Sequence, residues 1–169
     1  MSLSMYQASV PTFIHMLKNL SGILAKAVAH AEAKKIDPSV LLNARLAPDM
    51  FHLTRQIQIA ADIVKNGSAR LACVAIPSFP DTETSFPELQ ERLAKTITFL
   101  ESLTAAQIDG SDERTITMNM EKQPLNFNGL SYLLSFVYPN FYFHLTAAYA
   151  ILRHNGVDVG KMDFLGKIQ

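Results

Sequence analysis

Two polar side chains that could do chemistry lie on an apolar helix face near the C-terminal end of the sequence. The residues of this face follow one another at intervals of three or four: Leu133, Val137, Asn140, His144, Ala147 and Ile151. This spacing is typical of one face of an α-helix, so Asn140 and His144 are predicted to point inward, one turn apart. A buried polar group without a partner costs about 1–3 kcal/mol, so a side chain, water, metal or ligand must satisfy each of them.

The pair has three interpretations. It could be an internal hydrogen-bonded pair that fixes how the helices pack, which is the usual role of a histidine in a core. It could instead form the floor of a pocket that binds a small-molecule ligand. The third interpretation is that the face itself is misassigned, because Pro139 kinks or restarts the helix at this point.

A second polar line is predicted on an earlier helix that starts at Pro48. Asp49, His52 and Gln56 lie at positions i, i+3 and i+7 beside the apolar stripe of that helix. A carboxylate and an imidazole this close can share a cation or a proton. Asp49 also has a structural explanation, because a negative charge in the first turn is stabilised by the helix dipole. The three residues therefore indicate one wall of a functional site only if Asn140 and His144 of the last helix form the other.

The depths of the two histidines test that combination. In an up-and-down bundle the second and fourth long helices run parallel. At 1.5 Å per residue, His52 would stand about 6 Å along its helix, and His144 about 21 Å along a helix that starts near Leu130. A shared site therefore requires a helix break at Pro139.

The apolar periodicities predict an all-α fold, a single four-helix bundle domain spanning residues 1–169, with a looser orthogonal array as the alternative. The first expected helix covers about 4–35, or starts near Ser9 with Pro11 in its first turn. A short extra helix after Asp37, a long helix over 48–73 and a third long helix capped by Ser85 follow. The remaining elements are a small β-hairpin over about 114–128 with its turn at 121–124, a last helix capped by Asn128 or Ser131 and ending at His154, and an ordered C-terminal arm over 157–169.

Composition excludes several classes of protein. The 15 basic and 15 acidic residues cancel, so the sequence lacks the basic footprint of a nucleic-acid-binding protein. The sequence contains no run of about 18 apolar residues, so no membrane-spanning helix is predicted. The N-terminal residues do not resemble a secretory signal. The single cysteine, Cys73, indicates a reducing compartment, so we expect a cytoplasmic protein. The 49% hydrophobic content favours a homodimer that covers apolar surface.

Three segments resemble a bacterial family of unknown function within the DinB/YfiT-like metalloenzyme superfamily. They are SMYQASVPTFIHMLKNL, ARLAPDMFHLTRQIQIA and PNFYFHLTAAYAILRHNGVDVGKMDFLG, and the resemblance covers nearly the whole chain. It implies a four-helix bundle, often a homodimer. It also implies a divalent metal, Ni or Zn, held by one histidine of the second helix and a His-x-x-x-His pair of the last.

Carried onto this sequence, the resemblance implies His144 and His52 as metal ligands, while Asn140 replaces the first histidine of the pair. An amide is a far weaker ligand than an imidazole. Three functions therefore remain: a metal-dependent enzyme acting on a small, possibly thiol-bearing substrate, a metal-free small-ligand-binding bundle, and a dimeric structural module. Asn140, His144, Asp49 and Gln56 are the candidate ligand-pocket residues, and no catalytic residue is assigned.

Overall fold

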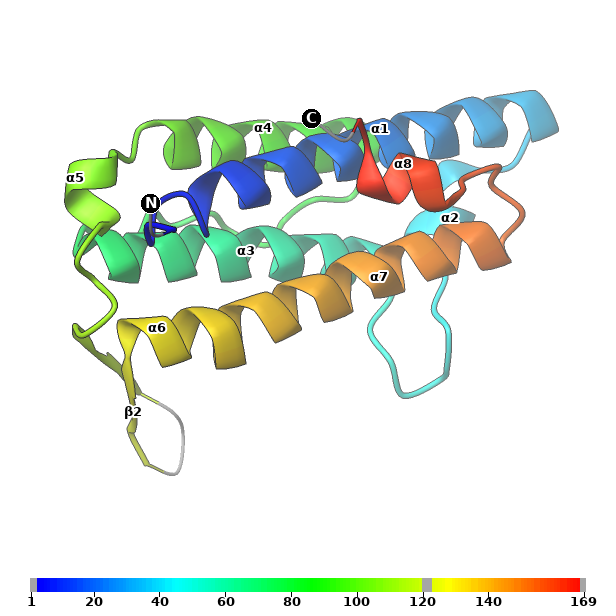
Figure 1. Ribbon diagram of the computed structural model, residues 1–169. Coiled ribbons are helices and arrows are strands. Elements are labelled where there is room, and N and C mark those ends of the chain that lie inside the picture. The colour runs from blue at the N-terminus through cyan, green and yellow to red at the C-terminus, as the bar shows by residue number, and fades with distance from the viewer. Residues whose placement is uncertain (1–2, 120–122, 168–169) are drawn as a thin grey trace.

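Four long helices form the body of the protein, whose computed structural model describes residues 3–119 and 123–167 (Figure 1). The elements, in chain order, are α1 (Val10–Lys34), α2 (Pro38–Leu42), α3 (Leu53–Ala72), α4 (Phe86–Glu101), α5 (Ala105–Ile108), β1 (Thr115–Met118), β2 (Leu125–Asn128), α6 (Gly129–Ser131), η1 (Tyr132–Val137), α7 (Tyr138–His154) and α8 (Lys161–Leu165). The four-helix bundle with a small antiparallel hairpin before its last helix is therefore confirmed.

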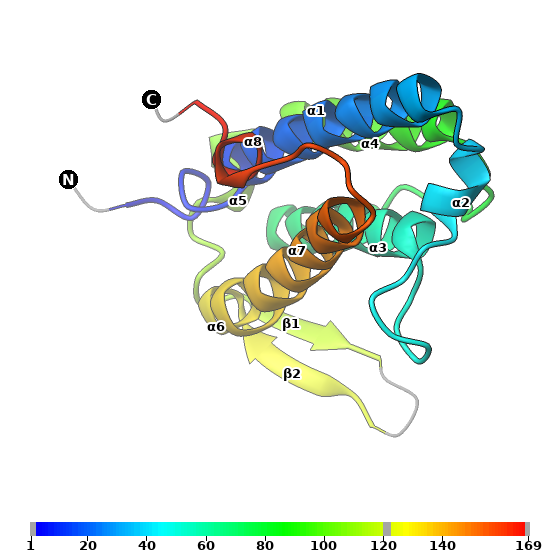
Figure 2. The ribbon, with the colours of Figure 1, turned by 90° about the vertical axis from the view of Figure 1, so that its right-hand side faces the viewer.

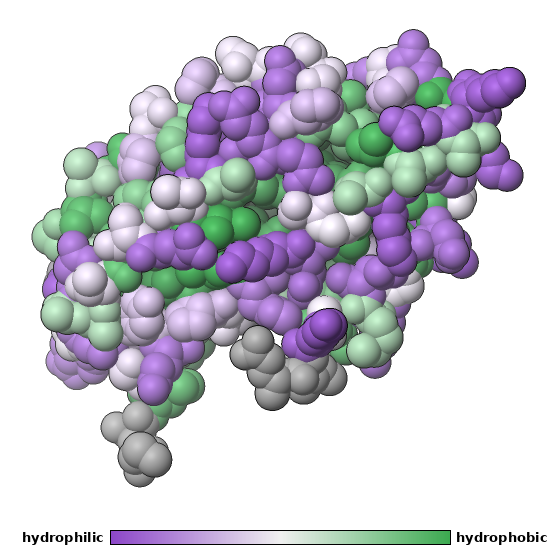
Figure 3. Space-filling model, turned by 90° about the horizontal axis from the view of Figure 1, so that it is seen from above, coloured by the Kyte–Doolittle hydropathy of each residue, from purple (hydrophilic) through white to green (hydrophobic). Residues whose placement is uncertain are grey.

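The long helices pack in two layers, α1 with α4 and α3 with α7 (Figure 2). In the first layer, Lys18 pairs with Glu101 at 3.4 Å and the Ser21 hydroxyl donates to Gln90 at 2.6 Å, so α1 and α4 are antiparallel. Hydrophilic and hydrophobic side chains are interspersed over the face that α1, α4 and α8 present (Figure 3). Buried apolar side chains from both layers form the core, in which the Phe13 ring of α1 lies 5.5 Å from the Phe141 ring of α7.

Helices α3 and α7 are antiparallel too. A Cβ atom on Gly67 would lie 2.9 Å from Val137, near the start of the last helix, whereas Gln56 contacts His144 further along it. Segment 73–85 crosses over so that α4 runs in the same direction as α3 (Figure 1). The assumption that the second and fourth long helices run parallel was therefore wrong, and so was the depth argument built on it.

Local capping signals confirm several predicted helix starts. The side chains of Asp37, Ser85 and Asn128 accept hydrogen bonds from backbone N–H groups two or three residues later. The expected helix start at Pro48 is wrong, however. Residues 43–52 form a loop, and α3 begins at Leu53, whose N–H donates to the carbonyl of Ala44.

The last helix is continuous from Gly129 to His154, so the chain does not break at Pro139. It widens instead into the π-helical segment η1, where the Tyr138 N–H bonds the carbonyl of Leu133, five residues earlier. Pro139 has no N–H to donate, and its ring crowds the carbonyl one turn earlier, which accounts for a widened turn directly before it. Asn155 and Gly156, with φ +88°, end the helix as predicted.

The hairpin and the arm flank the bundle. Strands β1 and β2 pair with Thr115 opposite Asn128 and Met118 opposite Leu125. The predicted turn at 121–124 lies partly outside the described residues. The arm packs on α1, where the Asn19 amide donates to the carbonyl of Phe164 at 3.0 Å. Across the described residues, no helix combines the length and apolar character that a membrane crossing requires.

Candidate functional site

A cavity of about 270 Å³ opens between α3, η1 and the hairpin. Its lining comes from α3, from β1 and from η1: Arg55, Ile59, Asp62, Ile63, Asn66, Arg70, Met118, Tyr132 and Phe136. Side-chain bonds join α3 to the last helix on both sides of it. Arg70 donates to the Tyr132 hydroxyl at 3.2 Å, and Gln56 meets His144 at 2.6 Å. We call this region, from the Arg70–Tyr132 bond to the Gln56–His144 bond, the α3–α7 cleft.

The Gln56 amide links His144 to the backbone of the preceding loop. Gln56 is 1% exposed, and its Nε2 donates to the carbonyl of Phe51 at 3.0 Å. A carbonyl oxygen can only accept, so this bond fixes which end of the amide faces His144. The other end is the acceptor Oε1, which lies 2.6 Å from Nδ1 of His144.

This arrangement determines where the imidazole carries its hydrogen. Nδ1 of His144 must donate to Gln56, so in the neutral ring Nε2 carries a lone pair. Nε2 has no hydrogen-bond partner among the described residues, and the side chain is half-buried. His144 therefore offers an unused acceptor that can take a hydrogen bond, accept a proton or bind a single cation.

Burial and positive charge keep this imidazole neutral. Burial lowers the pKa of His144 below its ordinary value, and the nearby Arg55 guanidinium lowers it further. The pKa of His52 is lowered by the same two kinds of cause, burial first and then Arg45 and Arg55. Both histidines are thus unprotonated at neutral pH.

We expect the His144 ring to titrate below pH 6.5, with hydrogen on Nδ1 and a bare Nε2 at neutral pH. Two-dimensional ¹H–¹⁵N NMR of the ring nitrogens measures both properties. Between the folded-state pKa and the ordinary value of about 6.5, the unfolded chain binds more protons than the folded chain, so the free energy of unfolding rises with pH. The contribution of His144 to stability is therefore fully present above about pH 6.5 and is lost as the pH falls through the folded-state pKa.

Arg55→Gln removes only the second cause, so it should raise the pKa of His144 without restoring the ordinary value. His154, exposed at the end of the same helix, is the internal control. A bare Nδ1 on His144 would contradict the hydrogen-bond chain.

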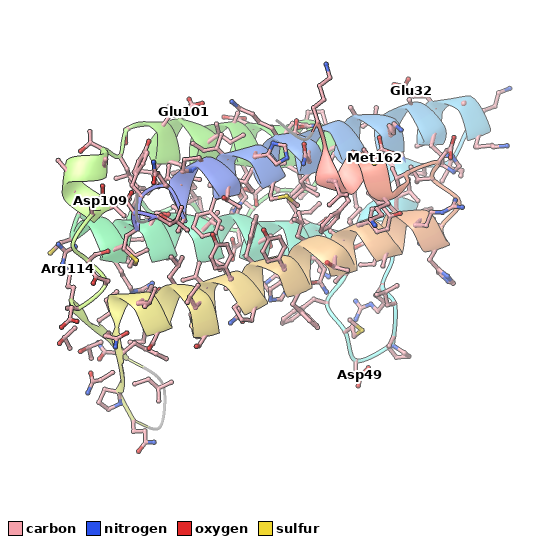
Figure 4. All side chains as sticks on the ribbon, viewed as in Figure 1. Glu32, Asp49, Glu101, Asp109, Arg114 and Met162 are labelled. Atoms are coloured by element: carbon pink, nitrogen blue, oxygen red, sulfur yellow. The ribbon has the colours of Figure 1, made fainter. Side chains whose placement is uncertain are left out.

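The remaining predicted site residues are placed less favourably. Asn140 is half-buried, and its Nδ2 donates to the carbonyl of Phe136 at 2.7 Å, one turn back on its own helix. His52 is the residue that precedes α3, half-buried near Arg55. Asp49 lies exposed at the tip of the 43–52 loop, away from the helices (Figure 4), because α3 begins later than predicted. The polar line of Asp49, His52 and Gln56 is therefore not formed.

The donor set does not fit a three-histidine metal centre. Within residues 3–119 and 123–167, no three histidine, cysteine, aspartate or glutamate side chains come close enough together to hold a metal. The Gln56 amide is committed at both ends, and the Asn140 amide nitrogen donates to its own helix. Among the described residues, the two expected ligands His144 and His52 keep ring nitrogens without a hydrogen bond, so at most two imidazoles are available, whereas Zn²⁺ sites take three or four protein ligands.

The cavity residues were not predicted, although their spacing carried a signal. Arg55, Ile59, Asp62, Asn66 and Arg70 follow one another at intervals of three or four along α3. On the last helix, Tyr132, Phe136, Asn140 and His144 lie exactly four residues apart. These two stripes could have been read as opposite walls of one cleft.

A charged cluster beside the cleft was also not predicted. Arg92 of α4 is 2% exposed and lies 2.9 Å from a carboxylate oxygen of each of Asp62, Asp81 and Glu83. Lys65, 3% exposed, pairs with Asp62 at 2.8 Å. Since Asp81 and Glu83 belong to segment 73–85, the cluster fastens that segment to α3 and α4.

Comparisons with known proteins agree with this architecture. The chain is similar to a crystal structure of a DinB family member protein from Shewanella denitrificans, with 45% sequence identity and a TM-score of 0.88 over 96% of this chain and 92% of that one. No curated protein matches. The family described as domain of unknown function (DUF1993) matches residues 5–165. The chain therefore belongs to the DUF1993 family.

Proposed function

We propose that this protein binds a small organic molecule in the α3–α7 cleft without a resident metal. The observation that carries the proposal is the bond from His144 Nδ1 to a Gln56 amide anchored on Phe51, which leaves a neutral imidazole with a free Nε2. A cavity that begins at Arg55, the neighbour of Gln56 on α3, is lined by both apolar and polar side chains and provides the volume for a small ligand, although His144 itself does not line it. A single imidazole suits hydrogen bonding to a ligand better than it suits holding Zn²⁺ or Ni²⁺.

The Asn66 side chain supports the same conclusion. It lines the cavity, and its buried Oδ1 accepts no hydrogen bond from the described residues. A buried polar atom without a protein partner calls for an explanation, and a bound ligand is one of those that fit a cavity-lining side chain. Asn66, which lines the cavity, and His144, which does not, thus each keep unused hydrogen-bonding capacity between α3 and the last helix.

Native mass spectrometry of the untagged full chain tests the proposal together with metal analysis. We expect a retained non-covalent small molecule in the wild type, its loss in His144→Ala, and substoichiometric metal in both. His154→Ala is the matched control, because His154 is exposed on the same helix and should retain the molecule. His144→Ala should remain folded, since its ring is only half-buried.

Two outcomes would contradict the proposal. Stoichiometric nickel or zinc that disappears in His144→Ala would support the metal-dependent enzyme of the DinB-like type acting on a small, possibly thiol-bearing substrate. No retained molecule and no metal, with only a loss of stability in His144→Ala, would support a structural module, and its predicted homodimer could then be tested by sedimentation.

A further inference from the structure

One cation in the cleft lacks a counter-ion within the part of the chain that the structure describes. Arg55, at the α3 N-terminal end of the cavity, pairs with Asp81, and Asp62 is shared between Lys65 and Arg92. Arg70, at the other end, pairs with no carboxylate among residues 3–119 and 123–167. Of its five N–H donors, the described residues use one, from Nη1 to the Tyr132 hydroxyl.

Flat apolar surfaces lie next to this guanidinium. The rings of Tyr132 and Phe136 stack with centroids 5.6 Å apart and planes 11° apart. Phe127 of β2 tilts against both rings and holds them in place. Ile59 and Ile63 of α3 and Met118 of β1 complete an apolar lining. Such walls favour a flat hydrocarbon or aromatic body through stacking and dispersion.

These two features together specify a class of ligand. A guanidinium binds carboxylates through two parallel N–H···O bonds, more specifically than an ammonium does. A volume of about 270 Å³ is just below the range of drug-sized pockets, so it suits a single-ring molecule. We propose that the cavity binds a small aromatic carboxylate, with its carboxylate on Arg70 and its ring among Tyr132, Phe136 and Met118. This inference rests on the proposed function, because it names the ligand class of the same cleft.

Benzoate is the probe and benzyl alcohol is its neutral counterpart. The full chain is labelled with ¹³C at the methionine methyl groups, and the Met118 signal, assigned with Met118→Leu, is followed through each titration. We expect saturable shifts of Met118 with benzoate, and a dissociation constant at least about ten-fold higher for benzyl alcohol. Arg70→Gln should raise the benzoate constant at least about ten-fold and leave that of benzyl alcohol within about two-fold.

Arg153→Gln is the matched control, since Arg153 occupies the last turn of α7 as Arg70 occupies the last turn of α3, and it is exposed. Arg70→Lys keeps the positive charge but loses the pair of parallel N–H donors of the guanidinium, so it should weaken benzoate binding less than Arg70→Gln does. The wild-type comparison of the two probes decides the proposal even if a variant does not fold.

Equal constants for the two probes, or an unchanged benzoate constant in Arg70→Gln, would overturn the carboxylate assignment. Saturable Met118 shifts with benzyl alcohol alone would overturn it too, while leaving a ligand-binding cleft. If neither probe shifts the Met118 signal, the assignment of an aromatic carboxylate as the ligand is wrong. The proposed function is then decided by the native mass spectrometry of the wild-type protein, which shows whether any small molecule is retained.

Discussion

Replacing Arg92 with methionine is expected to lower the free energy of unfolding by about 3 kcal/mol, the lower end of the range for breaking a buried ion pair. Methionine fills similar space but leaves Asp62, Asp81 and Glu83 without their common cation. The loss stays at the lower end because these carboxylates keep some solvent contact, and because Lys65 and Arg55 still pair with two of them. Urea denaturation followed by circular dichroism measures it.

Lys95→Met is the control for this change. Lys95 lies on the same helix and pairs with Glu91, but both side chains are more than half exposed. An exposed pair contributes about 0–1 kcal/mol, so the control should unfold at nearly the wild-type urea concentration. A loss in Arg92→Met no larger than in Lys95→Met would mean that solvent already satisfies the cluster.

Gly129→Ala should destabilise the fold still more, by about 4 kcal/mol or beyond. A Cβ atom at Gly129 would lie 1.8 Å from the backbone oxygen of Ser111, and a backbone atom cannot rotate away as a side chain can. The same junction includes a hydrogen bond from the Leu130 N–H to the carbonyl of Asp112. The added methyl group must therefore separate the start of the last helix from segment 109–114.

Gly22→Ala provides the opposite result within the same protein. Gly22 lies inside α1, where an added Cβ would meet nothing within 4 Å. Alanine there should stabilise the protein by about 0.5–1 kcal/mol through helix propensity. Thermal and urea denaturation of both variants test the pair, and a Gly129→Ala protein as stable as wild type would show that the two backbone segments can move apart freely.

The capping signals were predictable because they are local. Asp37, Ser85 and Asn128 bond backbone groups within three residues, so their identity and position suffice. The start of α3 was not predictable in the same way. Loop 43–52 is held by contacts that depend on the folded arrangement, such as the Thr54 hydroxyl donating to the carbonyl of Leu42. Pro48 resembles a helix start, but these contacts override it.

The candidate site was predicted only in part for a related reason. Periodicity identified His144 and Gln56 as polar groups beside apolar faces, but it did not reveal that α3 and the last helix run in opposite directions. That direction depends on the crossover of segment 73–85, which Asp81 and Glu83 fasten through Arg92. With antiparallel helices, Gln56 and His144 meet without a break at Pro139. Arg70 and Tyr132 meet beside the other end of the cavity.

The pairing of α3 with the last helix also sets an order of events during synthesis. Gln56 and His144 are 88 residues apart in the chain. At about 5–20 residues per second, a ribosome needs roughly 4–18 s to make that stretch. Throughout this interval the last helix does not yet exist, so the side of α3 that packs against it is open to chaperones. Slower translation between these positions should therefore prolong chaperone association and leave the finished protein unchanged.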